Sequence, residues 1–298
     1  MTVHDAPAIG AGPLARRVAD MAALTKPRLN AMAVFAVVVG WWAEVGFDGP
    51  VLPLLVAILG SGAVACGASV FNQVVERDRD ALMKRTCERP LAAGRMSVSD
   101  AVLIGVALSV GGLLILAVGS TPLATALSAL TLVTYVAIYT PLKTRTSLNT
   151  LVGTIPGALP PLIGAAAAAG SLSPRAWFLF ALIGAWQLPH FLSIAWLYRR
   201  DYERAGYAML PVVTGGSGAT GRQIVVQGML TLLVSLAAWP LGLAGTAYFV
   251  VALVAGALFV GTGVLFLFRR TDAAARLVLR ASLLHLPIVL TAFALASA

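Results

Sequence analysis

Long, continuously apolar runs constrain the fold of this chain more than any other feature of its sequence. A helix that crosses a lipid bilayer needs about 20 mostly apolar residues, and we count about nine such runs in the 298 residues. Because the runs are apolar throughout rather than at alternate positions, they predict helices and not the strands of a barrel. The expected fold is an all-α polytopic membrane protein. The runs lie at about 29–46, 51–73, 101–118, 122–140, 149–169, 175–197, 223–243, 246–268 and 278–297.

The composition excludes several other classes of protein. Hydrophobic residues make up 59% of the chain and charged residues 11%, whereas a soluble globular protein carries about 25% charged residues. So few charges could not cover a water-soluble surface. The net charge of +9 would favour nucleic-acid binding in a soluble protein, but no basic run or aromatic–basic platform is present. We therefore expect a lipid bilayer, and no nucleic acid, as a partner.

The basic residues predict the orientation of the chain. With the N-terminus inside, every lysine and arginine except Arg175 falls in a cytoplasmic segment, and membrane proteins show this bias. We expect a multi-pass protein of the cell (inner) membrane, with a cytoplasmic N-terminus and an outside C-terminus. Residues 1–24 then form a cytoplasmic segment and 25–298 the transmembrane domain. Within that segment, Leu14–Leu24 could form an amphipathic helix on the membrane surface.

Polar residues gather at one face of the predicted bundle. Two inner loops, about Val74–Asp100 and Tyr198–Arg222, are long and polar, whereas the outer connections are short and nearly uncharged. A transporter usually holds its substrate near the middle of the membrane, in broken helices. Polar chemistry at one face instead points to a site where a water-soluble head group meets a lipid-buried tail.

An acceptor stripe, made of Asn72, Glu76 and Asp80, ends the second apolar run. Their spacing of i, i+4 and i+8 gives a drift of about 40° and a rise of about 6 Å per step on a helix. Asp78 lies about 160° from Glu76 and joins the stripe only if the helix unwinds. Carboxylate and amide oxygens suit Mg²⁺, which keeps several waters and bridges to substrate phosphates. The alternative is a solvated, mixed-charge helix end.

Basic residues on the same inner face are candidates for holding an anionic substrate. Arg85 and Arg89 follow the stripe directly, and Lys143 and Arg145 lie in the third inner loop. Arginine is well suited to bidentate contacts with phosphate. Simple anchoring of the inner loops by positive charge is the alternative.

The loop after the sixth run carries a second polar cluster. Tyr198 and Asp201 in this loop could supply a further metal or phosphate contact, and a plain surface loop is the alternative. His190 is embedded in the apolar run that precedes it, where an ionisable residue is costly and often functional. Its imidazole could ligate or approach a metal-bearing ring, or form a hydrogen bond within the bundle.

Taken together, the motifs resemble those of the protoheme IX farnesyltransferases (haem O synthases), a branch of the UbiA-type intramembrane prenyltransferase superfamily. The resemblance runs from about Leu24 to Ala298. The stripe indicates the superfamily, and its combination with the other motifs indicates the haem branch. The segments that carry it are Leu24-Thr-Lys-Pro-Arg28, Asn72 to Asp80 with Ala-Leu-Met-Lys84-Arg85-Thr86, Arg89-Pro90-Leu91, Tyr139-Thr-Pro-Leu-Lys143, Gly157-Ala-Leu-Pro-Pro-Leu-Ile-Gly164, Gln187-Leu-Pro-His190-Phe191, and Asp201-Tyr202 with Met209-Leu-Pro211.

The resemblance implies nine transmembrane helices around a central cavity, with the polar site at the cytoplasmic face. It implies Mg²⁺ on farnesyl diphosphate, haem B as the acceptor, and His190 near the haem. The stripe would hold the metal and diphosphate together with Asp201. The residues expected to bind substrate are Arg85, Arg89, Arg145, His190 and Tyr198, and those expected to serve catalysis are Asn72, Glu76, Asp80, Lys143 and Asp201.

Two features depart from the superfamily pattern. The middle acidic position is Glu76, where many relatives have aspartate, and glutamate reaches one methylene further. The second loop lacks the double aspartate of quinone-prenylating relatives, which leaves the metal role of Asp201 open.

The reaction implied by the resemblance forms haem O, which a haem A synthase, a candidate partner, would consume. Three other functions stay open at this point. The same machinery could prenylate an aromatic quinone precursor. The chain could also be a transporter or lipid carrier with an acidic gate, or a haem-binding assembly factor without catalysis.

Overall fold

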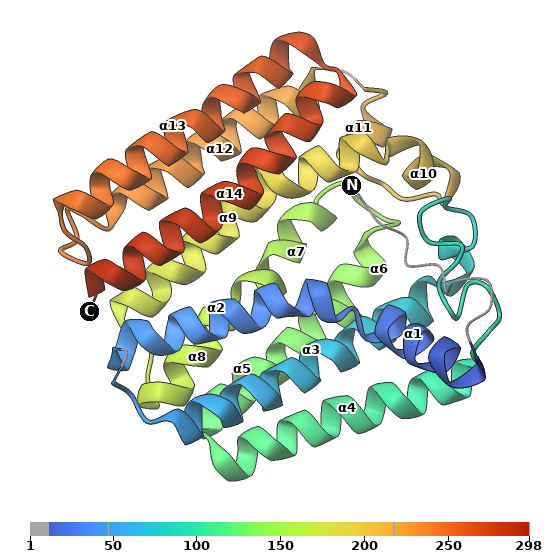
Figure 1. Ribbon diagram of the computed structural model, residues 1–298. Coiled ribbons are helices and arrows are strands. Elements are labelled where there is room, and N and C mark those ends of the chain that lie inside the picture. The colour runs from blue at the N-terminus through green and yellow to red at the C-terminus, as the bar shows by residue number, and fades with distance from the viewer. Residues whose placement is uncertain (1–11, 47, 217, 298) are drawn as a thin grey trace.

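A computed structural model describes residues 12–46, 48–216 and 218–297, and in these ranges the chain is helical with no strand. In these ranges seven long helices are continuous, and Figure 1 shows how they are arranged. Two further membrane-length segments are each built from shorter pieces. The continuous helices are α2 (Pro27–Val45), α3 (Val51–Asp80), α4 (Val98–Gly119), α9 (Pro174–Leu197), α12 (Ala219–Ala237), α13 (Thr246–Arg269) and α14 (Asp272–Ser297).

The two composite segments change helix geometry partway along their length. The first consists of α5 (Pro122–Val133), a π-helical turn (Thr134–Tyr139) and the short α6 (Thr140–Leu142). The second consists of α7 (Asn149–Ala158) and α8 (Pro160–Ala169). Proline has no amide hydrogen, so the Pro160–Pro161 pair interrupts the helical hydrogen bonds between α7 and α8.

Eight segments in the described part of the chain are long and apolar enough to cross a membrane, against the nine runs expected. The ninth, α12, has a membrane-spanning length of 19 residues but is not one of the eight. Its first turns carry the polar residues Thr220, Arg222 and Gln223. Compared with the expected run at 223–243, α12 begins earlier, at Ala219. It ends earlier, at Ala237, because the turn that contains Pro240 separates it from α13.

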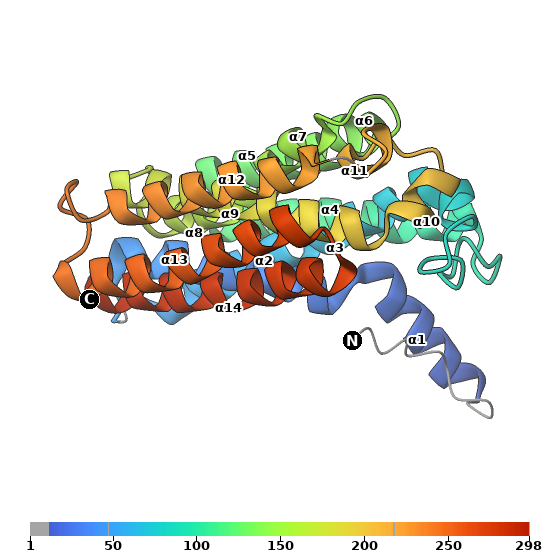
Figure 2. The same cartoon turned by 90° about the horizontal axis from the view of Figure 1, so that it is seen from above.

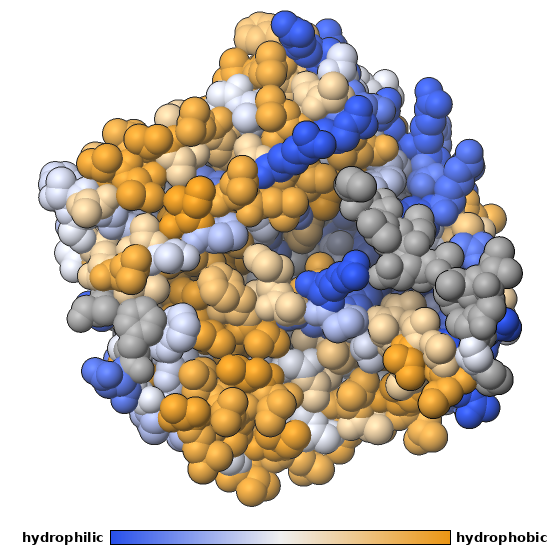
Figure 3. Space-filling view, in the orientation of Figure 1, coloured by the Kyte–Doolittle hydropathy of each residue, from blue (hydrophilic) through white to orange (hydrophobic). Residues whose placement is uncertain are grey.

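The helices lie side by side with their polar connections collected at one end (Figure 2). The short helices α1 (Pro13–Thr25), α10 (Arg199–Arg204) and α11 (Leu210–Val213) lie at this end, together with the 81–97 loop. The last turns of α14 lie at the opposite end. Much of the outer surface is apolar, and hydrophilic side chains concentrate near the α1 and α10 end (Figure 3). Exposed leucines along the helices, such as Leu103 and Leu258, are therefore lipid-facing residues.

The N-terminal helix forms where the amphipathic helix was expected. Leu14, Val18 and Met21 are exposed on α1. Leu24, at its other end, is fully buried. The amide of Gln73 in α3 donates hydrogen bonds to the carbonyl oxygens of residues 23 and 24, so the end of α1 is fixed beside the acceptor stripe. Binding of α1 to a membrane surface stays a prediction.

Reciprocal glycines bring α2 and α8 into backbone contact. A Cβ on Gly40 of α2 would lie 2.0 Å from the carbonyl oxygen of Pro161, and a Cβ on Gly164 of α8 would lie 1.9 Å from that of Val37. In a bilayer, helices associate through close van der Waals packing of small residues, since lipid is as apolar as the side chains. This contact holds the broken helix α7–α8 against α2.

Replacing Gly164 by alanine is expected to destabilise the protein by about 2 kcal/mol or more, because the new methyl group forces two backbones apart. The midpoint of thermal unfolding in detergent should fall by about 5 °C. Gly111 of α4 is the matched control, since a Cβ added there would have nothing within 4 Å. Gly111→Ala should leave the midpoint unchanged or raise it, and an equal fall in both variants would contradict the packing argument.

Candidate active site

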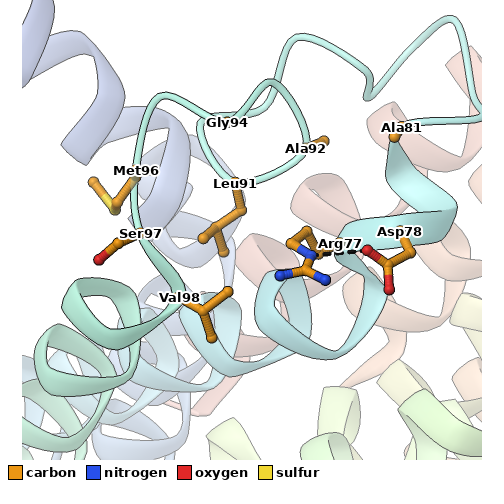
Figure 4. A pocket seen from close by; sticks show the side chains of 9 residues that line it. All are labelled: Arg77, Asp78, Ala81, Leu91, Ala92, Gly94, Met96, Ser97 and Val98. Carbon is orange, nitrogen blue, oxygen red and sulfur yellow. Dashed lines mark hydrogen bonds and ion pairs between the residues drawn. The ribbon is translucent and has the colours of Figure 1, made fainter.

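The last turns of α3 bury the acceptor stripe, whereas Val75, Asp78 and Arg79 on the other side of the helix are exposed. Asn72, Glu76 and Asp80 are 2%, 5% and 1% exposed. The helix is regular through Asp80, so Asp78 points away from the stripe. The Asp78 carboxylate pairs with Arg77 at 2.8 Å, and both side chains line a separate surface hollow of about 350 Å³ (Figure 4). The helical periodicity thus places Glu76 and Asp80 on the buried face of α3 and Asp78 on an exposed face.

Each member of the stripe contacts one cation from another segment. The Nζ of Lys26 donates to Asn72 Oδ1 at 3.1 Å, and the Nζ of Lys143 donates to Glu76 Oε1 at 2.8 Å. Arg89 donates to Asp80 Oδ2 at 2.7 Å. The three cations come from the α1–α2 junction, the loop after α6 and the 81–97 loop. Two carboxylates and an amide are therefore each paired with a basic side chain in one partly buried cluster.

Lys26 is a site residue to which the sequence assigned no role. It stands between α1 and α2 with φ at +50°, in the left-handed region that lysine rarely adopts. Burial, with the positive charge of Arg89, lowers the pKa of Lys26 to about 7. The signal in the sequence was a basic residue before a proline at the inner start of a span, which is also what simple charge anchoring produces.

The π-helical turn and the second loop position Lys143. Thr140 donates to the carbonyl of Tyr135 at 2.8 Å and accepts from the Asn72 amide at 3.2 Å. The backbone carbonyl of Lys143 accepts from the amide of Ala208 at 2.8 Å. Burial alone would lower the pKa of Lys143, but the adjacent Glu76 carboxylate raises it well above its usual value. Lys143 therefore stays charged.

The donor set of the stripe fits a divalent cation that retains other ligands. The Oδ1 atom of Asp80 is buried and has no hydrogen-bond partner, and a buried carboxylate oxygen without a partner is costly. No cluster of three or more His, Cys, Asp or Glu side chains that could hold a metal occurs in the described residues. Two carboxylates and an amide suit Mg²⁺, whose remaining positions are filled by water and substrate phosphate.

Arg85 joins the first polar loop to the second. Its guanidinium lies 4.6 Å from the centre of the Tyr198 ring, and it donates to the Tyr202 hydroxyl at 3.3 Å. Its Nε is buried without a partner. Tyr198 thus supports an arginine through its ring face in this structure, and Arg85 retains an unused donor for an anion.

Asp201 and Arg145 do not contact the stripe. Asp201 pairs with Arg204 and borders a hollow of about 220 Å³, together with Asp272 and Arg199. The Arg145 side chain is exposed, and no hydrogen bond or ion pair involves it in the part of the chain described here. The roles expected for both residues stay predictions.

Tyr207 is a buried residue near Glu76 that the sequence did not indicate. Burial is the larger cause of the raised pKa of the Tyr207 hydroxyl, and the negative charge of Glu76 is the next.

His190 lies on α9, half-buried, with a serine and a tryptophan around its ring. Its Nδ1 is 2.8 Å from Ser282 Oγ on α14. The indole of Trp186 stacks on the imidazole, with the ring centres 4.8 Å apart. Figure 3 shows a recess that lies over α6 and α7, between α2 and α14, with hydrophilic side chains at its margin.

Comparison with known proteins identifies the family. The UbiA prenyltransferase family matches residues 33–286. A protoheme IX farnesyltransferase from Solibacter usitatus is 43% identical over 279 residues, which cover 91% of this chain and 96% of the relative.

Solved structures share the fold at low sequence identity. A structure described as digeranylgeranylglyceryl phosphate synthase superposes with a TM-score of 0.79 at 16% identity, covering 95% of this chain and 99% of the other. A UbiA homologue from Archaeoglobus fulgidus, bound to DMAPP and Mg²⁺, gives 0.62 at 15% identity, covering 91% and 99%. With its helical bundle and buried acceptor stripe, the chain belongs to the UbiA prenyltransferase family.

Proposed function

We propose that this protein transfers the farnesyl group of farnesyl diphosphate to a vinyl group of haem B, with addition of water, to give haem O and diphosphate. The observation that carries the proposal is the buried acceptor stripe of α3, faced by Lys26, Lys143 and Arg89. The 43% identity to a protoheme IX farnesyltransferase over 91% of the chain supports the choice of substrates.

Asn72, Glu76 and Asp80 are the residues that would hold Mg²⁺. The ion, when bound, neutralises charge on the departing diphosphate. In the structure described here, Lys143 and Arg89 donate to these carboxylates. When a diphosphate binds, the same ammonium and guanidinium groups can donate to its oxygens, because charge-assisted bonds to phosphate are strong. The Arg85 guanidinium, with its unused Nε, supplies a further donor.

The cations therefore stabilise the charge that develops as the allylic C1–O bond breaks and its electron pair leaves with diphosphate. A vinyl carbon of the porphyrin then forms a bond to C1, and one water molecule captures the new cation and loses a proton. The apolar helices around the site keep bulk water away from the allylic cation. The farnesyl chain, being apolar, lies among those helices.

The location and the fate of the product follow from the same proposal. The protein lies in the cell (inner) membrane with the N-terminus and the stripe on the cytoplasmic side and the C-terminus outside. The positive loops at the stripe end support this orientation. Haem O is then consumed by a haem A synthase. The proposed site also includes Asp201, Arg145 and Tyr198, which would contact the metal or the diphosphate once the substrate is bound.

Purified protein in detergent, given farnesyl diphosphate, haem B and Mg²⁺, is expected to form farnesylated haem that mass spectrometry detects. Chelating the metal with EDTA should abolish product formation, and restoring Mg²⁺ should recover it, because the protein's own cations alone cannot neutralise the diphosphate.

A small aromatic acid in place of haem B is the control acceptor and should give no prenylated product. Prenylation of the aromatic acid instead of haem would contradict the choice of acceptor. Flux of the isoprenoid without diphosphate release would point to transport, and haem binding without any product would point to an assembly factor.

A further inference from the structure

The contacts of His190 determine which of its ring nitrogens carries the proton. Nδ1 lies 2.8 Å from Ser282 Oγ, and that hydroxyl oxygen lies 2.7 Å from the backbone carbonyl oxygen of Leu279. Both distances are those of hydrogen bonds and need a proton between the two atoms. A serine hydroxyl has only one proton to give.

These two contacts have a single consistent arrangement of protons. The carbonyl of Leu279 has no proton, so the hydroxyl of Ser282 must donate to it. The proton in the second contact must then come from Nδ1 of His190. A neutral imidazole that is protonated on Nδ1 carries its lone pair on Nε2.

The Nε2 atom is left open. No described residue forms a hydrogen bond with it, and it is not one of the buried polar atoms that lack a partner. It therefore faces accessible space. A nitrogen lone pair of this kind, on a half-buried ring in a membrane domain, is suited to ligating a metal centre and is a poor partner for an anion.

The ring is also held against rotation. Trp186 stacks on it with an angle of 21° between the ring planes. The indole Nε1 of Trp186 donates to the backbone carbonyl of Ser282 at 2.9 Å. Ser282 thus anchors both rings, one through its hydroxyl and one through its carbonyl. Metal-binding histidines characteristically have such a partner on the other ring nitrogen, which fixes the tautomer and the ring orientation.

His190 and the stripe lie at similar depths below the same face. His190 precedes the end of α9 at Leu197 by seven residues, which is about 10 Å along a helix. Asn72 precedes the end of α3 at Asp80 by eight residues, about 12 Å. Both helix ends point toward the polar end of the bundle (Figures 1 and 2).

We propose that Nε2 of His190 binds the iron of the haem substrate as an axial ligand, and that Ser282 is a positioning residue that keeps Nδ1 as the donor. The inference rests on the proposed function in taking haem as the acceptor. It adds the ligating atom and the residue that sets its tautomer.

Titration of the full-length protein in detergent with ferric haem B tests this assignment, read by the Soret band and by electron paramagnetic resonance. His190→Ala should lose the spectrum of imidazole ligation, and added imidazole should restore it. Ser282→Ala should weaken haem binding by about tenfold or more, whereas Ser282→Thr keeps the hydroxyl and should bind as the wild type does. Gel filtration verifies that each variant is folded.

Ser193→Ala is the matched control. This serine is also buried beside His190, but its hydroxyl donates to the backbone carbonyl of His190 at 2.7 Å and not to the ring. Its haem affinity should stay within about twofold of the wild type.

An unchanged spectrum in His190→Ala, or equal affinities in Ser282→Ala and Ser193→Ala, would overturn the assignment. Formation of farnesylated haem by the wild type in that case leaves the proposed function intact. Conversely, a wild type that binds haem through His190 but never forms product refutes the proposed function and supports the ligand. A wild type that binds no haem refutes both.

Discussion

Asp80→Asn is expected to lower kcat/KM for farnesyl diphosphate by about a thousandfold. The substitution keeps the size of the side chain but removes a buried negative charge, one oxygen of which has no partner. Groups that stabilise developing charge in a water-excluded site contribute about 10²–10³ in rate each, and a weakened hold on the metal adds to this loss. Release of diphosphate in the presence of haem B and Mg²⁺ is the measurement, with the Mg²⁺ dependence recorded for both proteins.

Asp78→Asn is the matched control for this prediction. The same chemical change is made two residues away on the same helix, but the Asp78 side chain is 85% exposed and pairs with Arg77. Its turnover should lie within about twofold of the wild type. Similar losses in the two variants would mean that the general negative charge of the helix end matters, and the acceptor stripe would lose its proposed role.

The difference between these two aspartates could be predicted from the sequence, because it depends on local geometry alone. A helix has 3.6 residues per turn, so the spacing of Asn72, Glu76 and Asp80 places them on one face wherever the helix is regular. The expected membrane-spanning helices follow from equally local information, the length of each apolar run. Helix ends were less well predicted, since turns such as the one with Pro240 shorten a run that hydropathy alone extends.

The partners of the stripe could not be predicted in the same way. Lys26 and Lys143 reach Asn72 and Glu76 across 46 and 67 residues of sequence, and that approach depends on how whole helices pack. The π-helical turn that precedes Lys143 has no evident signal in a run of apolar residues. Ser282 lies 92 residues from His190, and its relevance appears only when α9 and α14 lie side by side.

Because long-range packing is not visible in the sequence, the sequence assigned Asp201 to the same site as the acceptor stripe, although the structure separates them. Asp201 lies in a loop with an acidic and basic pattern like that after α3, but the carboxylate pairs within its own short helix with Arg204. The composition of a loop does not show whether a carboxylate forms an ion pair with a neighbouring residue or is available to contact a substrate.

Lys143→Met is expected to lower kcat by about a hundredfold or more, with a smaller effect on the binding of haem. Among the described residues, this ammonium group is the only cation within hydrogen-bond distance of Glu76, and methionine keeps the length of the chain without the charge. Its loss removes a donor that would stabilise the departing diphosphate. The assay follows single-turnover release of diphosphate, which separates chemistry from product dissociation.

Two further variants, the double variant Lys143→Met/Glu76→Gln and the single variant Lys84→Met, separate the effect on catalysis from the effect on stability. Lys143→Met alone leaves the buried Glu76 carboxylate unpaired and should lower the unfolding midpoint, because breaking one side of a buried ion pair is costly. Adding Glu76→Gln should restore much of the midpoint but none of the activity. Lys84→Met removes a charge from an exposed side chain in the 81–97 loop and should leave turnover nearly unchanged. If the double variant recovered turnover together with stability, Lys143 would be only a structural partner of Glu76, and the diphosphate contact assigned to it would be wrong.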